Sequence, residues 1–175
     1  SGATPERLLL PSPGVDSSAL DWSRDGSVIV FRRSAVQPDS GDGLWVLPLS
    51  GNAKPFLFVG GRLNGEEGAL SPDGRWLAHT SKETGTLQVL LRSFPDPSRE
   101  MRQLSTDGGA SPRWRGDGKE LYYLDPNGRI MAVAITSGRD LVVGKAAALF
   151  TSPLPWPGLP GVSISPYDVT ASGQR

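Results

Sequence analysis

The stretch Ser111-Pro-Arg-Trp-Arg-Gly-Asp-Gly-Lys-Glu-Leu-Tyr-Tyr-Leu124 predicts the local structure from which the rest of the fold follows. Its centre is the pair Asp117-Gly118, which lies between two runs of strand character. Glycine tolerates a positive φ and aspartate accepts hydrogen bonds from the nearby backbone, so the pair favours a tight turn between antiparallel strands. We therefore expect a β-hairpin here.

The same unit recurs along the chain. Further copies occupy residues 20–30, 70–78 and 167–173, the last with Ser172 in place of the aspartate. The turn glycines at positions 26, 74, 118 and 173 are 48, 44 and 55 residues apart. A period in the forties that carries short strands indicates a repeat architecture.

Composition excludes several classes of protein. The 175 residues contain 18 Lys and Arg and 18 Asp and Glu, so the formal net charge is zero and no basic surface for nucleic acid is indicated. No apolar run approaches the roughly 18 residues that span a bilayer, so we expect no membrane insertion. Cysteine is absent, which excludes disulfides and thiol chemistry.

Each repeat is expected to form four short antiparallel strands, and no helical periodicity extends over ten residues. The first repeat, 17–60, would contain strands 18–22, 28–32, 43–48 and 54–59. The second, 61–106, would contain strands 67–70, 76–81, 87–94 and 99–104. The third, 107–151, would contain strands 111–114, 120–125, 129–135 and 147–150. Residues 1–16 would be an outer strand of a preceding unit, 152–166 a Pro-rich loop, and 167–175 the start of a further, incomplete unit.

A single four-stranded sheet cannot bury both of its faces, so neighbouring sheets must stack. Radial stacking of such sheets, called blades, is the β-propeller. Residues 71–78, Ser-Pro-Asp-Gly-Arg-Trp-Leu-Ala, resemble the repeat of TolB-like and WD-repeat-like propellers. Residues 104–133 are similar to the propeller that follows the kinase domain in many bacterial serine/threonine kinases. The fold expected is all-β, with about three blades that make half of a six-bladed ring.

The resemblance implies a sensory or scaffolding role and a periplasmic or otherwise extracytoplasmic location. Three blades leave two open flanks, so we expect either a second copy that completes the ring about a two-fold axis or the remainder of a longer chain. Our leading interpretation is a non-catalytic module that binds a protein or peptide. The alternatives are the gating propeller of a prolyl-peptidase-like hydrolase and a propeller that binds a small ligand or a sugar.

The candidate binding residues follow from the fold. Loops that join the outer strand of one blade to the inner strand of the next gather at one mouth of a propeller. Residues expected at that mouth are Arg62, Asn64, Glu66, Glu67, Asp107 and Arg113. Trp156, flanked by prolines, either contacts a partner or packs on the surface of the ring.

Other chemical patterns have simpler structural interpretations. The recurring Asp25, Asp73 and Asp117 are expected to stabilise turns rather than to form a ring of carboxylates. The tryptophans at 22, 76 and 114 are expected to pack between sheets. Residues 39–43 lack the ligand spacing of a calcium loop. His79 is the only histidine, and no nucleophile elbow is present, so we expect no metal, no cofactor and no enzymatic activity.

Overall fold

The computed structural model describes residues 15–35, 41–51, 53–61, 64–83, 85–138, 140–153, 167–170 and 172. The first sheet contains β1 (Val15–Trp22), β2 (Val28–Ala35), β3 (Gly43–Pro48) and β4 (Phe56–Gly60). The second contains β5 (Asn64–Leu70), β6 (Trp76–Ser81), β7 (Gln88–Ser93) and β8 (Met101–Gln103). The third contains β9 (Ala110–Trp114), β10 (Glu120–Leu124), β11 (Arg129–Ser137), β12 (Leu141–Val143) and β13 (Ala147–Thr151).

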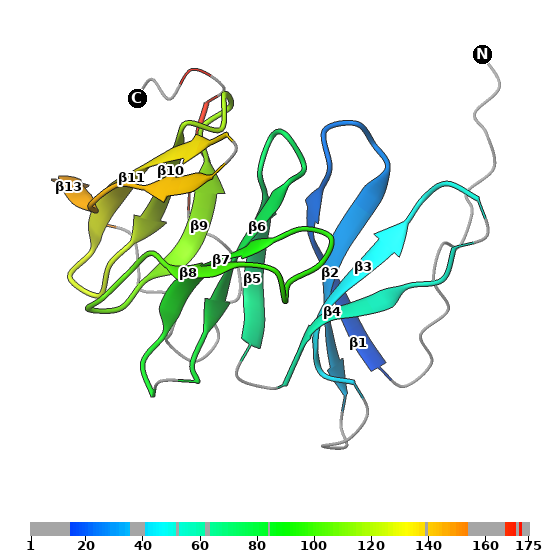
Figure 1. Cartoon of the computed structure of the whole chain (residues 1–175). Helices are drawn as coiled ribbons and strands as arrows, with labels where there is room; N and C mark the ends of the chain where they lie inside the picture. Colours follow the sequence, from blue (N-terminus) through cyan, green and yellow to red (C-terminus); the bar gives the residue numbers. More distant parts are fainter. Residues whose placement is uncertain are drawn as a thin grey trace, which may run out of the picture.

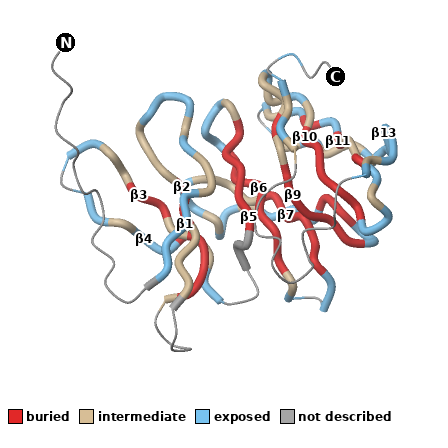
Figure 2. The backbone as a smooth tube through the Cα atoms, turned by 180° about the vertical axis from the view of Figure 1, so that it is seen from behind, coloured by how far each residue is buried: buried red, intermediate tan, exposed pale blue. Residues whose placement is uncertain are grey.

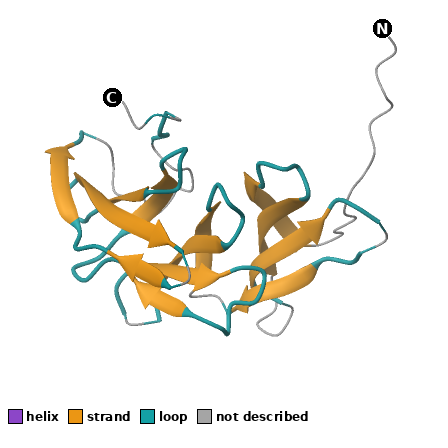
Figure 3. Cartoon of the chain, turned by 45° about the horizontal axis from the view of Figure 1, so that its top comes forward, coloured by secondary structure: helices purple, strands orange, loops and turns teal. Residues whose placement is uncertain are grey.

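The three sheets are antiparallel and stand side by side as an arc of blades (Figure 1). In each sheet the strands follow chain order from β1, β5 or β9 outward, and β5 packs against both β1 and β9. The described residues contain strands and loops but no helix (Figure 3), and hence no helix able to cross a membrane. The all-β fold and the half-propeller arrangement are therefore confirmed.

Two features differ from the expectation: residues 15–16 belong to the inner strand β1 and not to an outer strand of a preceding unit, and the third sheet has an additional strand, β12. β11 is nine residues long, and its outer edge pairs with β13 through Arg129–Ala132 and with β12 through Ile135–Ser137. The third blade consequently has five strands rather than four. β12 covers only the three residues Leu141–Val143, which is too short a run to show an alternating pattern in the sequence.

The Asp-Gly turns have the geometry that the sequence predicts. Gly26, Gly74 and Gly118 have φ values of 72°, 67° and 73°, in the left-handed region that favours glycine. In each turn an aspartate Oδ1 accepts the N–H two residues further on, at 3.0 Å for Asp25, 3.1 Å for Asp73 and 2.9 Å for Asp117. These carboxylates stabilise the hairpins, so the structural interpretation of the three aspartates is confirmed.

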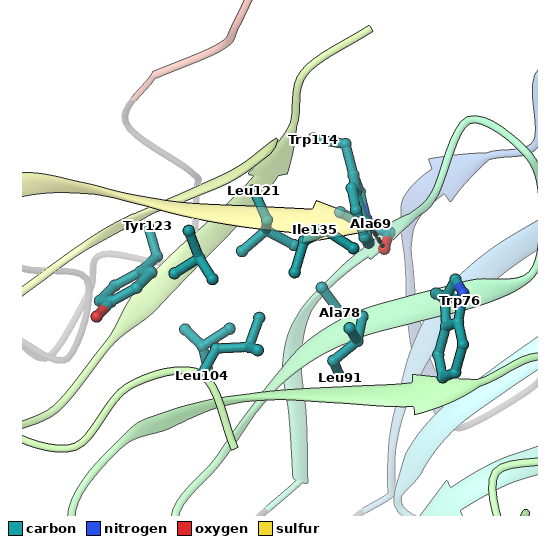
Figure 4. Close-up of a cluster of buried hydrophobic side chains, with 11 residues drawn as sticks. Ala69, Trp76, Ala78, Leu91, Leu104, Trp114, Leu121, Tyr123 and Ile135 are labelled. Carbon is teal, nitrogen blue, oxygen red and sulfur yellow. Dashed lines mark hydrogen bonds between the residues drawn. The ribbon is translucent and has the colours of Figure 1, made fainter. Parts of the chain in front are cut away.

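The hydrophobic core lies between neighbouring sheets. Between the second and third sheets, Trp114, Leu121 and Ile135 face Ala78 and Leu91 (Figure 4). Between the first and second sheets, Val30, Leu44, Val46 and Phe58 pack against Leu70 and Leu77. Figure 2 shows these buried stretches along the middle of the strands, while most of the turns are exposed. Burial of these side chains between neighbouring blades thus fixes the relative positions of the inner strands β1, β5 and β9.

Two of the three tryptophans expected to pack between sheets do so. Trp76 and Trp114 are buried, and their Nε1–H groups donate to Ser137 Oγ at 2.8 Å and to the Ala69 carbonyl at 3.1 Å. The expectation is wrong for Trp22, which is 59% exposed. Trp22 pairs with Ile29 on the face of the first sheet turned away from the second, and no sheet of the described residues packs there.

Candidate functional site

The carboxyl ends of the three inner strands converge on a cavity of about 670 Å³. Its walls are residues 20–22 and 24 from β1 and its turn, 69–72 from β5, 113–114 from β9, and 167–169. Each inner strand ends at its Asp-Gly turn, so the repeat itself places four chain segments around one space. The cavity is therefore a consequence of the radial packing rather than of any single loop.

Asp21 ties the first blade to the second at the cavity wall. Its Oδ2 accepts the N–H of Leu70 at 2.7 Å and its Oδ1 accepts the N–H of Trp22 at 2.8 Å. Burial raises the pKa of Asp21 above its usual value, while these N–H groups and the positive charge of Arg113 act in the opposite direction. The nearby Asp168 raises the pKa further.

A second set of bonds joins β5, β9 and residues 167–170. The buried Glu67 accepts hydrogen bonds from the Ser111 N–H and, at 2.7 Å, from the Ser111 hydroxyl. The Tyr167 hydroxyl donates to the Ser111 carbonyl at 2.7 Å, and burial raises the pKa of Tyr167, so the phenol keeps its proton. Ser111 has a φ of 54°, which is strained for a residue other than glycine, and the carboxylate of Glu67 holds this conformation.

Of the expected binding residues whose side chains the structure describes, which are Glu67, Asp107 and Arg113, only Arg113 lines the cavity. Glu67 is buried against Ser111, and the exposed Asp107 lies in the loop before β9, outside the cavity lining. Asn64 and Glu66 lie in β5, but their side chains are outside the described residues, as are Arg62 and Trp156. The loops expected to form the mouth precede the inner strands, whereas the cavity lies where those strands end.

Asp21, Arg24, Tyr167 and Asp168 line the cavity but are not among the residues predicted from the sequence, although the repeat contains a signal for two of them. Trp22, Leu70, Trp114 and Val169 occupy equivalent positions of the four repeats, shortly before the turn, and carry the large side chain of each repeat. The residue immediately before them is, in chain order, Asp21, Ala69, Arg113 and Asp168. All four line the cavity. Aligning the repeats at this position would have identified the charged residues that face the axis.

The described residues offer little for metal binding or catalysis. No group of three or more His, Asp or Glu side chains among them is placed to hold a metal ion. His79 is fully buried in β6, where its Nε2 accepts a hydrogen bond from Arg92 Nε at 3.2 Å, and it does not line the cavity. The groups that line the cavity therefore include the guanidinium groups of Arg24 and Arg113, the carboxylates of Asp21 and Asp168, and the exposed residue Trp22.

No family model and no curated protein sequence matches the chain. Among solved structures, TolB from Acinetobacter baumannii is similar with a TM-score of 0.60 and 16% identity, over 90% of this chain and 36% of that one. The putative TolB from Agrobacterium tumefaciens has a TM-score of 0.61 and 18% identity, over 79% of this chain and 50% of that one. An auxiliary nutrient binding protein from Bacteroides thetaiotaomicron has a TM-score of 0.51 and 15% identity, over 74% of this chain and 30% of that one.

The likeness shows the fold of the chain. At these identities the similarity is one of architecture, and it establishes a TolB-like β-propeller fold. The chain spans half or less of the length of these structures.

Proposed function

We propose that the chain is a non-catalytic propeller module that binds an extended peptide or protein segment in the cavity at the carboxyl ends of β1, β5 and β9. The observation that carries this proposal is the cavity itself, whose volume of about 670 Å³ lies in the range typical of ligand sites. It is walled by four chain segments and contains hydrogen-bonding groups of both kinds, which suits the N–H and C=O groups of a peptide.

The chemistry of the cavity supports binding rather than catalysis. Asp21 already accepts hydrogen bonds from two backbone N–H groups, and the Tyr167 hydroxyl donates a hydrogen bond to the Ser111 carbonyl. A general base needs a free lone pair aimed at the proton that it removes, and a nucleophile needs an adjacent base. Ser71 lines the cavity and donates its hydroxyl to Asp73 Oδ1 at 2.6 Å, but its Oγ also accepts the N–H groups of Arg75 and Trp76, so this pair stabilises the turn.

A sugar is the second candidate ligand, and one observation favours it. Trp22 is 59% exposed and lines the same cavity. An exposed indole offers a flat apolar face on which a sugar ring can stack. A saccharide would then take the place that we assign to the peptide.

Cross-linking selected peptides tests the proposal. Peptides of about a dozen residues would be selected from a display library, labelled with a photoreactive group and cross-linked to the chain. We expect the cross-links to fall on residues 20–24, 69–72, 113–114 and 167–169. Cross-links confined to other surfaces, or a response to saccharides alone in titrations followed by tryptophan fluorescence, would refute peptide binding at this site.

A further inference from the structure

We propose that the cavity recognises a carboxylate on its ligand, and that Arg24 and Arg113 are the groups that bind it. The inference rests on the proposed function of the cavity and adds the chemical group that gives the site its preference. The ligand is then an acidic peptide, with the carboxylate supplied either by an Asp or Glu side chain or by the C-terminus.

The arginines of the cavity have hydrogen-bond donors to spare. Arg24 is exposed and, within the described part of the chain, makes no hydrogen bond or ion pair. Arg113 donates from Nη1 to the Pro112 carbonyl at 2.9 Å, and its other N–H groups have no hydrogen-bond partner among the described residues. A guanidinium carries five N–H donors arranged to match a carboxylate, so each arginine retains the donors for a bidentate contact.

The carboxylates near these arginines are engaged with the backbone. Asp21 accepts the N–H groups of Trp22 and Leu70, and Asp168 accepts the N–H of Val169 at 2.8 Å. Asp25, next to Arg24 in the chain, accepts hydrogen bonds from Ser23 and Ser27 within its turn. Burial raises the pKa of Asp21 and the positive charge of Arg113 lowers it, whereas Arg24 makes no ion pair or hydrogen bond among the described residues. Arg24 is therefore the cation that a ligand carboxylate would neutralise.

A second, smaller cavity indicates the path of the ligand. It has a volume of about 190 Å³ and shares Arg24, Leu70 and Pro72 with the larger cavity. Val28, Leu70 and Phe94 contribute apolar walls to it, beside the turns of Asp25 and Asp73. Arg24 thus lies between the larger cavity and a small one whose walls are partly apolar and partly formed by Ser23, Asp25, Ser27 and Asp73. We infer that the acidic group of the peptide is neighboured by an apolar side chain that enters the smaller cavity.

The test compares matched peptides and matched arginine variants. A peptide obtained by the selection above would be titrated by fluorescence anisotropy in four forms: unchanged, with Asp and Glu replaced by Asn and Gln, with an amidated C-terminus, and with both changes. We expect the doubly changed peptide to bind at least tenfold more weakly than the unchanged one. The form that loses affinity on its own identifies the source of the carboxylate.

Arg24→Gln is the informative variant because the Arg24 side chain is exposed and makes no hydrogen bond or ion pair among the described residues. We expect it to weaken binding of the acidic peptide at least tenfold and to leave the affinity of the doubly changed peptide unaltered. Arg102→Gln is the control, since Arg102 is a half-exposed arginine that pairs with Glu100 at 2.7 Å on the outer strand β8. An unchanged Tm for both variants shows that the fold is intact.

The outcomes separate this inference from the proposed function. If all four peptide forms bind equally and still cross-link to the cavity, the carboxylate assignment is wrong while peptide binding stands. If no peptide binds but citrate or acetate does, with an affinity that Arg24→Gln reduces, the carboxylate assignment holds and peptide binding is wrong. If neither peptides nor small carboxylates bind, both are wrong.

Discussion

One position of the repeat, immediately before Trp22, Leu70, Trp114 and Val169, places side chains in the wall of the cavity. Asp21, Arg113 and Asp168 occupy this position in three repeats, and Ala69 occupies it in the fourth. The repeat backbone directs each of them to the same space, so their charges act on one another even though the residues are far apart in the chain. The backbone of the repeat is constant here, and variation at this position supplies three of the charged groups of the cavity, to which Arg24 in the turn after β1 adds a fourth.

His79 makes the stability of the chain depend on pH. Both of its ring nitrogens are engaged, Nε2 by Arg92 Nε at 3.2 Å and Nδ1 by the Thr80 carbonyl at 3.1 Å. Burial lowers the pKa of His79 from 6.5 to about 4, and the charge of Arg92 lowers it as well, whereas Glu83 has the opposite effect. Between these two pH values the unfolded chain binds a proton that the folded chain does not bind, so stability falls as the pH falls.

We expect the free energy of unfolding, measured by urea titration, to fall by roughly 1.5 kcal/mol between pH 6.5 and pH 5 because of this histidine. Gln offers an amide acceptor and donor in place of the ring but does not titrate. His79→Gln should therefore remove the histidine contribution and flatten the profile in this interval. An equal slope in the variant and the parent chain would show that His79 is not its source.

The interfaces between sheets stabilise the strands, and two equivalent tryptophans allow this to be measured. Trp114 is buried and its Nε1–H donates to the Ala69 carbonyl of the neighbouring sheet, whereas Trp22, at the same repeat position, is exposed. Trp114→Phe removes the donor, leaves the buried carbonyl without this partner and opens a small void. We expect a loss of roughly 1–3 kcal/mol in the free energy of unfolding.

At protein concentrations low enough for the monomer to predominate, Trp22→Phe is the matched control and should change the free energy of unfolding by less than about 0.5 kcal/mol, since the side chain is 59% exposed in the single chain. Urea or thermal unfolding of both variants gives the comparison. If both variants lose about 1 kcal/mol or more, Trp22 is also covered by a sheet. If both lose less than about 0.5 kcal/mol, the contact between Trp114 and Ala69 contributes little to stability.

The two flanks of the arc carry apolar side chains. On the third sheet, Tyr122, Leu124 and Ile130 form a cluster on the face turned away from the second sheet, where they are buried and Tyr167 and Val169 pack against them. On the first sheet, Trp22 and Leu57 lie on the face turned away from the second and are 59% and 45% exposed. We propose that these flanks are covered by a second copy of the chain or by further blades of a longer chain.

For this chain by itself, we expect self-association through the flanks. Light scattering after size-exclusion chromatography should give about twice the monomer mass of 18.6 kDa. Because burial of apolar area drives such contacts, the dimer fraction should rise with protein concentration. A mass of one chain over the whole accessible concentration range would contradict this expectation.

Local chemistry explains why so much of the fold follows from the sequence. An Asp-Gly pair specifies its turn through contacts within a few residues. The hairpins at Asp25, Asp73 and Asp117, and the spacing of the sheets along the chain, can therefore be predicted from the sequence. The site cannot be predicted in this way, because its residues come from segments far apart in the chain. Exposure of Trp22, the bond of Glu67 to Ser111 and the pairing of β12 each depend on which segments meet across the chain. The sequence by itself therefore determined the repeat and its strands, whereas the tertiary structure alone decided where the inner strands converge and which charges lie there.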